Sequence, residues 1–408
     1  MRILFLSHYF PPEVNAPASR TYEHCRQWVK DGHQVTVVTC VPNHPAGKVF
    51  PGYRNRLRQT ETRDGILVVR LWTYVTPNEG FLRRSLNYVM FMFMAILAAP
   101  FLPRCDVVVT TSPQFFNGLA GYFVSRLKRV PWVLEIRDLW PESILAVGAI
   151  ANRSVIRALE WLERFAYRKA DKIVVVTEAF KAHIRNCGIP AEKIEVIKNG
   201  VDLTLFTARP KDRQVAAELG LQGKFVVSYV GTHGMAHGLE TILDAAAKLK
   251  DHDDIRFLMV GDGAGRKSLV ERRDRMALGN VVMLGQQDRA RMPGIWAVSD
   301  ACLVVLRRLP LFQTVIPSKI FEIMAMGRPL ILAVEGESRD IVTRAEAGVC
   351  IPPEDPQALA DAVLALARDP ARSAALGRKG LAYVAQHHDR VALARYYCQV
   401  LDNTIGAR

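Results

Sequence analysis

A short segment near residue 320 carries charged and helix-ending residues at a spacing that suits a bound nucleotide. Ser318 is a favourable N-cap residue before Lys319 and Glu322, and Gly327, with a proline two positions later, ends the helix. A carboxylate on the first turns can accept hydrogen bonds from two ribose hydroxyls, while a lysine and the helix N-terminus can face a diphosphate. The same spacing also suits an ordinary Lys319–Glu322 helix pair, and this alternative stays open.

Two glycine-rich turns in the second half of the chain follow strand-like apolar runs. Such a turn lets the backbone approach a phosphate, although a purely structural tight turn has the same composition. The candidate nucleotide contacts in the first turn are Gly231, Thr232, His233, Gly234 and His237. The second turn, Gly261–Gly265, contributes Gly263, and Arg266 stands where a dinucleotide fingerprint needs its third glycine. A dehydrogenase is therefore disfavoured.

In the first half of the chain, two short segments carry side chains that could contact a second substrate. Trp140, which a proline follows, suits either local packing or the wall of an acceptor site. Asn15–Ala18 is expected in the first strand-to-helix loop, where an acceptor contact by Asn15 and a plain turn are both open. In the second half, the acidic run Asp251–Asp254 falls in a helix-to-strand turn, so we expect solvated side chains there and no metal site.

These segments lie on an alternating pattern of apolar runs and amphipathic helices, which is typical of parallel sheets with crossover helices. The strands expected in the first half are Ile3–Leu6, Gln34–Cys40, Ile66–Leu71, Asp106–Thr111, Trp132–Ile136 and Lys172–Thr177. The pattern restarts with Lys224–Val230, Ile255–Val260, Val281–Leu284, Ala301–Leu306 and Leu330–Val334. Helices between them are expected at Arg20–Lys30, Phe115–Arg126, Ser154–Arg168, Leu239–Lys250, Arg266–Ala277 and Lys319–Met326.

The chain of 408 residues is long enough for two domains, and Asn199–Asp212 has the composition of a linker. We therefore predict an α/β fold of two Rossmann-like domains that face each other across a cleft. The expected bounds are 1–200 for the N-terminal domain and 201–385 for the C-terminal domain. The helical residues 386–408 have no strand left to cover, and we expect them to cross back onto the N-terminal domain.

The segment Ser85–Pro103 contains no charged residue, with Arg83 and Arg84 before it and Arg104 after it. It is barely as long as the roughly 20 apolar residues that span a bilayer, and it falls between two expected strands of one domain. A core helix is one interpretation. The other is a helix partly immersed in the membrane interface, with the flanking arginines on anionic headgroups.

Composition and charge indicate a folded globular protein and limit the kinds of partner that it could bind. Hydrophobic residues make up 50% and charged residues 23% of the chain, as in a folded globular protein. The net charge of +14 favours anionic partners, but Lys and Arg form no basic stripe, which disfavours nucleic acid. Seven dispersed cysteines and the absence of a secretory signal predict a cytoplasmic protein. It would be peripheral on the inner face of the membrane if 83–104 makes contact there.

Taken in order, the motifs resemble those of retaining glycosyltransferases of family 4, which have the GT-B fold. The resemblance rests on Ser318–Gly327, the two glycine turns, Asn199–Asp202, Ala170–Thr177, Ser7–Glu13 and Arg137–Glu142. The last two resemble the branch of bacterial O-antigen and capsule pathways that includes N-acetylfucosamine-type transferases. The resemblance implies a nucleotide-sugar donor at the C-terminal domain, with UDP favoured, and an acceptor at the N-terminal domain. It implies no metal or other cofactor.

The resemblance also implies roles for residues of the C-terminal domain. Glu322 matches the ribose ligand of the family, but Thr314 stands where the family has another acidic residue. The phosphate loop of the family commonly carries an arginine and a lysine, which this chain lacks. Neutralisation of the diphosphate is thus expected from Lys319, helped by His237 or Arg307.

In the N-terminal domain, Arg137 stands where the family has a histidine, and Asp138 lies beside it. We expect Asp138 and Lys319 to be the catalytic residues, although Asp138 is chosen only as the nearest carboxylate to the acceptor side. The expected acceptor-binding residues are Asn15, Arg137 and Trp140.

The reaction expected from the resemblance is sugar transfer with retention at the anomeric carbon, without a metal. The sugar could be an N-acetylated amino or deoxy sugar, and the expected acceptor is a saccharide linked to polyprenyl diphosphate, in polysaccharide synthesis of the O-antigen or capsule type. A nucleotide-sugar 2-epimerase has the same architecture but needs no second substrate. A basic protein that binds membranes or nucleic acid is the alternative without catalysis.

Overall fold

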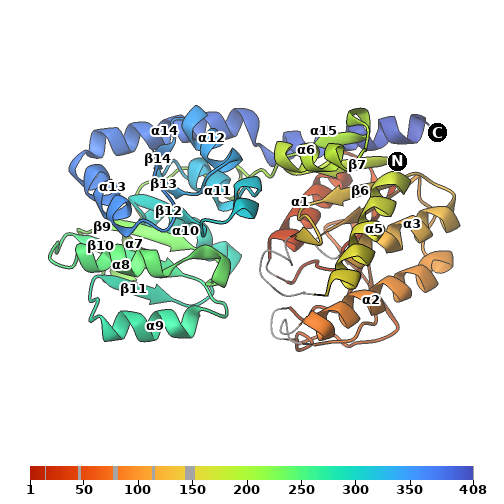
Figure 1. The fold of residues 1–408 in the computed structure, drawn as a ribbon, viewed down its shortest axis with the longest axis horizontal. Coiled ribbons are helices and arrows are strands. Elements are labelled where there is room, and N and C mark those ends of the chain that lie inside the picture. The colour runs from red at the N-terminus through yellow and green to blue at the C-terminus, as the bar shows by residue number, and fades with distance from the viewer. Residues whose placement is uncertain (14, 45–46, 77–80, 113–114, 143–151, 408) are drawn as a thin grey trace. The chain divides into compact units, whose positions relative to one another are not determined.

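The computed structural model describes residues 1–13, 15–44, 47–76, 81–112, 115–142 and 152–407, without the side chains of Phe81, Leu82, Arg84 and Phe115. By its packing the chain divides into an N-terminal unit, Met1–Lys198 with Arg390–Arg408, and a C-terminal unit, Asn199–Asp389. Figure 1 shows strands and helices in each unit. The predicted fold class, two α/β units of the Rossmann type with parallel sheets, is confirmed.

Within the described residues, the sheet of the N-terminal unit has eight strands in the order β3-β4-β2-β1-β5-β6-β7-β8. Their bounds are β1 (Arg2–Leu6), β2 (Gln34–Cys40), β3 (Arg58–Arg63), β4 (Ile66–Leu71), β5 (Val107–Thr111), β6 (Trp132–Ile136), β7 (Lys172–Val175) and β8 (Ile194–Val196). Neighbouring strands are parallel, except that β3 runs antiparallel to β4. The sequence analysis missed β3, which has the polar sequence RQTETR, and β8, which has three residues.

Both faces of this sheet are buried, which explains the nearly continuous apolar runs of its central strands. Along β1, Leu4 and Leu6 face one hydrophobic cluster, whereas Ile3 and Phe5 face the other. The first cluster includes residues of α2 (Phe81–Ala98), η1 (Ala99–Phe101), α3 (Phe115–Lys128), α5 (Arg153–Lys169) and α6 (Glu178–Asn186), which η2 (Ala191–Lys193) follows. The second cluster includes residues of α1 (Ala16–Lys30) and α15 (Arg390–Gly406).

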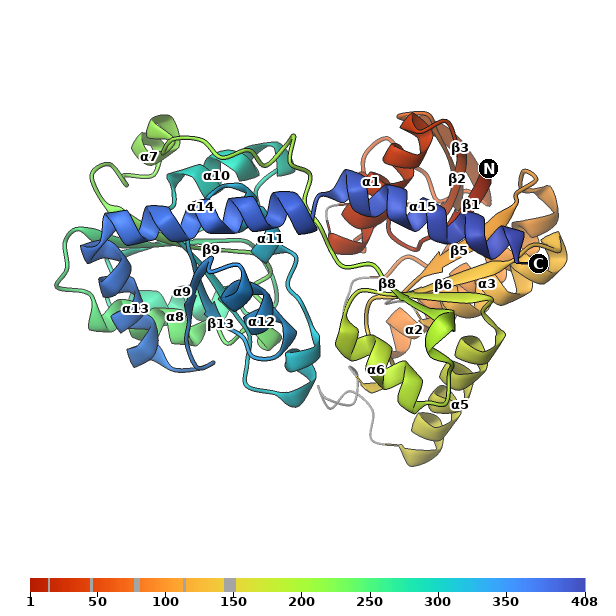
Figure 2. The same ribbon diagram turned by 90° about the horizontal axis from the view of Figure 1, so that it is seen from above.

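The last helix, α15, completes the N-terminal unit by packing on α1. The indole Nε1 of Trp28 donates to the carbonyl of Ala394 at 2.8 Å, and the Tyr397 ring packs edge-on against Trp28 with centroids 5.3 Å apart. Arg390 at the start of α15 pairs with Glu23 of α1. Figure 2 shows α15 beside α1. The chain therefore returns to its first unit after it has formed the second.

Helix α1 begins earlier than the sequence analysis predicted. Asn15 is its N-cap residue, and the side-chain oxygen of Asn15 accepts a hydrogen bond from the backbone N–H of Ala18 at 2.9 Å. The prediction of a strand-to-helix loop over Asn15–Ala18 is therefore wrong. Pro17 in this segment lies in the first turn of the helix, where its missing N–H costs no hydrogen bond.

The described part of the C-terminal unit has a six-stranded parallel sheet in the order β11-β10-β9-β12-β13-β14. Its strands are β9 (Phe225–Val230), β10 (Ile255–Val260), β11 (Val281–Leu284), β12 (Ala301–Val305), β13 (Leu330–Ala333) and β14 (Gly348–Cys350). Its longer helices are α7 (Arg213–Glu218), α8 (Glu240–Lys248), α9 (Arg266–Arg275), α10 (Met292–Val298), α11 (Lys319–Ala325), α12 (Glu337–Arg344), α13 (Pro356–Arg368) and α14 (Pro370–His387). Single turns are η3 (Met235–His237), η4 (Arg289–Arg291) and η5 (Pro310–Thr314). Among these strands, the sequence analysis missed β14, which has three residues.

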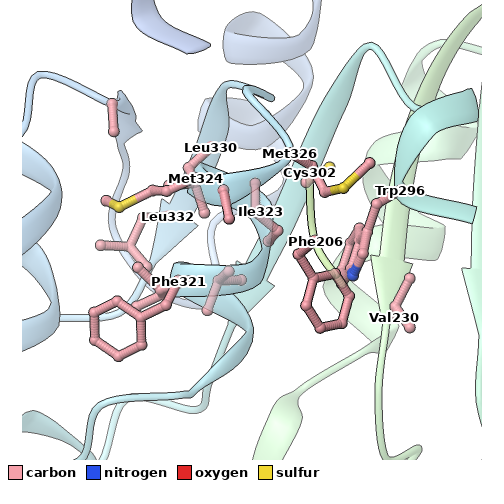
Figure 3. Packing of buried hydrophobic residues seen from close by; sticks show 14 of the residues in the cluster. Phe206, Val230, Trp296, Cys302, Phe321, Ile323, Met324, Met326, Leu330 and Leu332 are labelled. Carbon is pink, nitrogen blue, oxygen red and sulfur yellow. The ribbon is translucent and has the colours of Figure 1, made fainter. Parts of the chain in front are cut away.

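One hydrophobic cluster of this unit joins α10 and α11 to the sheet. Trp296 of α10 is fully buried there and lies near Phe206 and Val230 in Figure 3. Phe321 and its neighbours on α11 belong to the same cluster. The two helices are therefore anchored by buried apolar side chains, which fixes the polar residues that share their turns.

The apolar segment Ser85–Pro103 forms most of α2 and the turn η1. One face packs into the unit through Tyr88, Phe91, Ala95, Ala99 and Leu102. The opposite face exposes Leu86 (46%), Phe93 (51%), Leu97 (66%) and Phe101 (73%). The core interpretation therefore accounts for one face of this segment and leaves a second apolar face in solvent.

Across the ranges that the structure describes, no helix is both long and apolar enough to span a membrane.

Candidate functional site

Two loops at the carboxyl ends of β9 and β10 pack directly against each other. Gly261 has a φ of 145°, and a Cβ at this position would collide with the carbonyl oxygen of Gly231. A Cβ at Gly263 would lie 2.7 Å from the carbonyl oxygen of His233, whose own N–H donates to Asp262 at 2.9 Å. A purely structural tight turn therefore explains the glycines at positions 261 and 263. The same packing brings both predicted glycine turns to one place.

Lys319 lies beside the first of these loops. Its Nζ is 4.1 Å from the centre of the Tyr229 ring, and a Cβ on Gly231 would collide with the same atom. The hydroxyl of Tyr229 donates to the carbonyl of Thr232 at 2.9 Å, which ties the ring to the loop. Burial lowers the pKa of Lys319 to about 7, against the opposing influence of Glu322. The ammonium group therefore sits on an aromatic face beside the loop.

The two histidines of the loop are neutral at physiological pH. Burial, with Arg266 and Lys319 nearby, lowers the pKa of His233 to about 4. Burial and Lys319 likewise lower the pKa of His237 to about 4. Neither ring nitrogen of His233 has a hydrogen-bond partner in the described part of the chain. His237 Nδ1 lies 3.3 Å from the carbonyl of Gly234. The loop thus offers polar groups without a positive charge of its own.

Ser318 does not cap the helix as predicted. It already has helical angles, φ −61° and ψ −23°, and its side chain makes no capping hydrogen bond. The N–H groups of Ile320 and Phe321 bond instead to the carbonyls of Pro317 and Ser318, both at 3.1 Å. A tight turn therefore leads into α11, and the Ser318 hydroxyl is not used in capping.

Glu322 is half-buried one turn after Lys319. One of its oxygens, Oε2, accepts a hydrogen bond from the indole Nε1 of Trp296 at 3.3 Å. Burial raises the pKa of Glu322, and Arg289, the Trp296 hydrogen bond and Lys319 oppose this rise. Among the described residues, no ion pair joins Lys319 to Glu322. The helix-pair alternative is therefore not formed in this structure.

Thr314 and Arg307 already have partners within the C-terminal unit, which does not favour a direct contact with a diphosphate. The hydroxyl of Thr314, at the end of η5, donates to the carbonyl of Leu311 at 2.7 Å and so closes its own turn. Arg307 donates its backbone N–H to the carbonyl of Ala236 at 3.0 Å, while its guanidinium lies 3.9 Å from Glu240. Arg307 thus supports the loop with its backbone and has a carboxylate partner.

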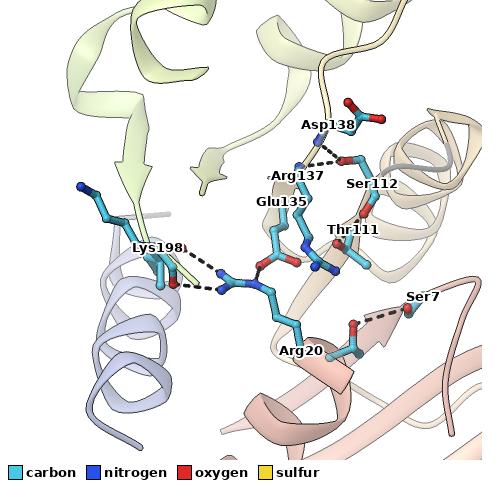
Figure 4. Close-up of polar contacts among 10 residues, drawn as sticks. Ser7, Arg20, Thr111, Ser112, Glu135, Arg137, Asp138 and Lys198 are labelled. Atoms are coloured by element: carbon cyan, nitrogen blue, oxygen red, sulfur yellow. Dashed lines mark hydrogen bonds and ion pairs between the residues drawn. The ribbon is translucent and has the colours of Figure 1, made fainter. Parts of the chain in front are cut away.

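In the N-terminal unit, the predicted residues Arg137 and Asp138 follow β6. Their backbone N–H groups both donate to Ser112 Oγ, at 2.7 and 3.3 Å (Figure 4). Burial lowers the pKa of Arg137 to about 10, although Glu135 favours the charged form. Nε and Nη1 of Arg137 are buried and have no hydrogen-bond partner among the described residues. Trp140, partly exposed, is three residues further along the chain.

A buried ion pair lies at the same end of β6. Arg20 of α1 donates to Glu135 at 3.0 Å, and their side chains are 4% and 1% exposed. The remaining guanidinium nitrogens donate to the carbonyls of Lys198 and Ile197 at 3.0 and 2.9 Å (Figure 4). Each charge of this pair is therefore met by a partner. Asn15, predicted for the same region, is engaged as the cap of α1.

Sequence reasoning missed Tyr229, Trp296 and Arg289, which surround Lys319 and Glu322. Tyr229 and Trp296 belong to apolar runs and are fully buried, so their pattern indicates core packing and hides the polar atom of each. Arg289 stands in a turn after β11 among other charged residues. The one available signal was that the carboxyl ends of neighbouring parallel strands share an edge.

In the described part of the chain, no three His, Cys, Asp or Glu side chains are grouped so that they could hold a metal ion.

The two halves of the chain match two family models. Residues 15–200 match a glycosyl transferase 4-like domain, and residues 224–369 match glycosyl transferases group 1. The colanic acid biosynthesis glycosyl transferase WcaI of Escherichia coli (strain K12) is 25% identical over 371 residues, which cover 88% of this chain and 90% of that protein.

Solved structures of similar fold cover nearly the whole chain. Sucrose-phosphate synthase from Thermosynechococcus elongatus has a TM-score of 0.80 at 20% identity, with 100% of both chains covered. HepE from Anabaena, solved in complex with UDP and glucose, has a TM-score of 0.74 at 20% identity and covers 98% of this chain and 99% of its own.

Proposed function

Since the chain belongs to the glycosyltransferases with the GT-B fold, we propose that it transfers a sugar from a UDP-linked donor to a saccharide acceptor with retention of the anomeric configuration. The observation that carries this proposal is the group of Lys319, Tyr229 and Glu322 beside the Gly231 loop. A cation without a carboxylate partner and a half-buried carboxylate lie within one turn of a helix. This arrangement suits a ligand that has both a diphosphate and a ribose.

The donor would bind to the C-terminal unit. Glu322 Oε1 and the remaining lone pairs of Oε2 would accept hydrogen bonds from the ribose hydroxyls. Lys319, the Ser318 hydroxyl and the backbone N–H groups of Thr232 and Gly234 would meet the diphosphate, since Gly231 and His233 donate theirs to backbone carbonyls. UDP is favoured because HepE, with a similar fold, was solved with UDP.

The chemistry at this site follows from charge. As the bond between the anomeric carbon and the diphosphate oxygen breaks, negative charge grows on the departing UDP. A fixed cation in a poorly hydrated site stabilises that charge strongly. Lys319 supplies it, whereas His233 and His237 stay neutral and offer hydrogen bonds. We propose that the protein provides this stabilisation without a metal ion or other cofactor.

The acceptor would bind to the N-terminal unit, near the residues that follow β6. Arg137 has two buried guanidinium nitrogens with no partner in the described residues, which suits an anionic group such as the diphosphate of a polyprenyl-linked saccharide. Asp138 is the carboxylate next to it and is proposed to contact the acceptor hydroxyl. Trp140 would form part of the wall. Asn15, the cap of α1, would contribute its amide group.

A lipid-linked acceptor also explains the second apolar face of α2. We propose that this face rests in the interface of the inner membrane leaflet. Exposed apolar residues continue onto α3, which packs against α2, at Phe123 (46%) and Leu127 (57%). Exposed arginines lie near the ends of these helices and would meet anionic headgroups: Arg83, Arg104, Arg126 and Arg129.

Flotation with vesicles of phosphatidylethanolamine and phosphatidylglycerol tests this contact. The double variant Phe93→Ser/Leu97→Gln changes only exposed side chains, so it should fold normally and float several-fold less than the native chain. Leu57→Gln, at a site that is 73% exposed just before β3, is the matched control and should float normally. Equal flotation of all three proteins would contradict membrane contact through α2.

The similarity to WcaI, which is named for colanic acid biosynthesis, supports our proposal of a role in bacterial polysaccharide synthesis of the O-antigen or capsule type. The candidate donor sugar, an N-acetylated amino or deoxy sugar, is proposed from the sequence motifs alone. Incubation with a panel of UDP-sugars and a polyprenyl-diphosphate-linked monosaccharide, in EDTA, tests the proposal. NMR of the product should show the anomeric configuration of the donor. An inverted linkage, or activity that needs manganese, would overturn the mechanism. A changed UDP-sugar in the absence of acceptor would favour the epimerase.

A further inference from the structure

Trp296 has a contact with Glu322 that core packing alone does not require. Its indole Nε1 donates to Glu322 Oε2 at 3.3 Å, from α10 to α11. We infer that Trp296 is a positioning residue, which holds the Glu322 carboxylate in the orientation that receives the ribose of the donor. This inference rests on the proposed function, because it assigns Trp296 a role through the ribose ligand.

The tryptophan side of this contact is rigid. Trp296 is 0% exposed and belongs to the same buried cluster as Phe206 and Val230 (Figure 3). Close packing on its ring leaves little freedom for rotation, so its single N–H points in one direction. A phenylalanine would fill much of the same space without any N–H. The nitrogen is therefore the part of this side chain that packing does not explain.

The glutamate side needs such a partner. Glu322 is only half-buried, and its spacing from Lys319 favours an ordinary helix pair. In the structure, Lys319 lies over the Tyr229 ring at 4.1 Å, and Glu322 is bonded to Trp296. The two aromatic residues thus keep the two charges apart. Both charges then remain directed to a ligand instead of to each other.

The electrostatic surroundings of Glu322 define a readout for this role. Lys319 on α11 and Arg289 on η4 favour its charged form, and burial opposes it. Of the other elements against α11, α10 and the strands β12 and β13 are apolar apart from Cys302. Helix α14 also packs on α11 and carries Arg378, Lys379 and Tyr383, and His388 after it stacks on Phe321. A hydrogen bond from Trp296 stabilises the carboxylate, so its loss should raise the pKa of Glu322.

The test compares UDP binding by the native chain and Trp296→Phe, measured by calorimetry between pH 5 and pH 8. The acid limb of binding should move up by about one pH unit, the size of a hydrogen bond to a charged group. The variant should therefore bind UDP more weakly than the native chain at the acid end of this range, and the difference should shrink as the pH rises toward 8. The KM for the donor should rise more than kcat falls.

Phe206→Leu is the matched control, since it loosens the same cluster and keeps the indole N–H. It should leave the acid limb unchanged. In a Glu322→Gln background, Trp296→Phe should have no further effect on UDP affinity, because the role runs through the carboxylate. Should the phenylalanine variant fail to fold, Trp296→Met removes the same N–H with a more adaptable side chain and must give the same shift.

The outcomes separate this inference from the proposed function. A Trp296→Phe protein with the native pH profile, or one matched by Phe206→Leu, overturns the positioning role. Unchanged UDP affinity in Glu322→Ala would instead overturn the proposed ribose contact, on which the inference depends.

Discussion

Arg20 and Lys319 are both poorly hydrated cations at the carboxyl edge of a parallel sheet, yet their surroundings differ. Arg20 has Glu135 and two backbone carbonyls as partners. Lys319 has an aromatic face and no carboxylate in contact. A buried cation whose hydrogen bonds are all met by the protein stabilises the fold. A buried cation that has no anionic partner destabilises the fold, and its charge remains available to bind an anionic ligand.

The largest effect should come from breaking the satisfied pair. Arg20→Met leaves the buried Glu135 carboxylate without its ion-pair partner, which costs about 3–5 kcal/mol of folding free energy. Urea unfolding measures this loss. Arg2→Met is the control, because Arg2 pairs with Asp106 at the surface and its removal should barely change the free energy of unfolding. If Arg20→Met instead leaves stability intact and abolishes catalysis, the contrast between the two cations fails.

The next effect concerns the cation without an anion. Lys319→Ala should lower kcat by about 10²–10³-fold, as expected for loss of one group that stabilises charge in the transition state. Donor KM should change much less, and stability should hold or rise, since a desolvated charge is removed. Steady-state kinetics measure both parameters, and Lys248→Ala, which changes an exposed lysine on α8, is the control. A change confined to KM would assign Lys319 to ground-state binding only.

Glu322→Ala should lower the affinity for UDP, and this effect should be somewhat smaller than that of Lys319→Ala on kcat. Removing one or two hydrogen bonds to a charged acceptor costs about 1.5–3 kcal/mol each, so UDP affinity should fall at least tenfold. Calorimetry at pH 7.5 measures this, with Glu271→Ala on the exposed face of α9 as control. The free energy of unfolding should stay near that of the native chain, in contrast with Arg20→Met.

The smallest effect is a pH dependence. Lysine is charged below its pKa, and the pKa of Lys319 is lowered to about 7 by burial. The kcat/KM for the donor should therefore fall about tenfold per pH unit above pH 7, on the alkaline side of the acid limb that Glu322 sets. His233 and His237 should add no inflection between pH 6 and pH 9. A plateau that extends to pH 9 would show that Lys319 keeps an ordinary pKa in the working enzyme.

The same contrast explains what could be predicted from the sequence. The strands and glycine turns were visible because burial on both faces and left-handed backbone each demand particular residue types. Glu322 and Lys319 were visible because they stand out on a short helix. Arg20 was not, because its partner Glu135 is 115 residues away and lies inside an apolar strand. Trp296 and Tyr229 could not be predicted, because a buried aromatic residue gives the same hydrophobic pattern whether or not its N–H or O–H group makes a functional hydrogen bond.

The return of α15 to the N-terminal unit has a consequence for synthesis on the ribosome. The face of α1 that carries Trp28 is covered only when Ala394 and Tyr397 have been made, about 200 residues after β8. At about 5–20 residues per second, this takes about 10–40 seconds. The unit that is translated first is therefore completed last, and throughout that interval the nascent chain keeps an apolar surface for a chaperone to bind.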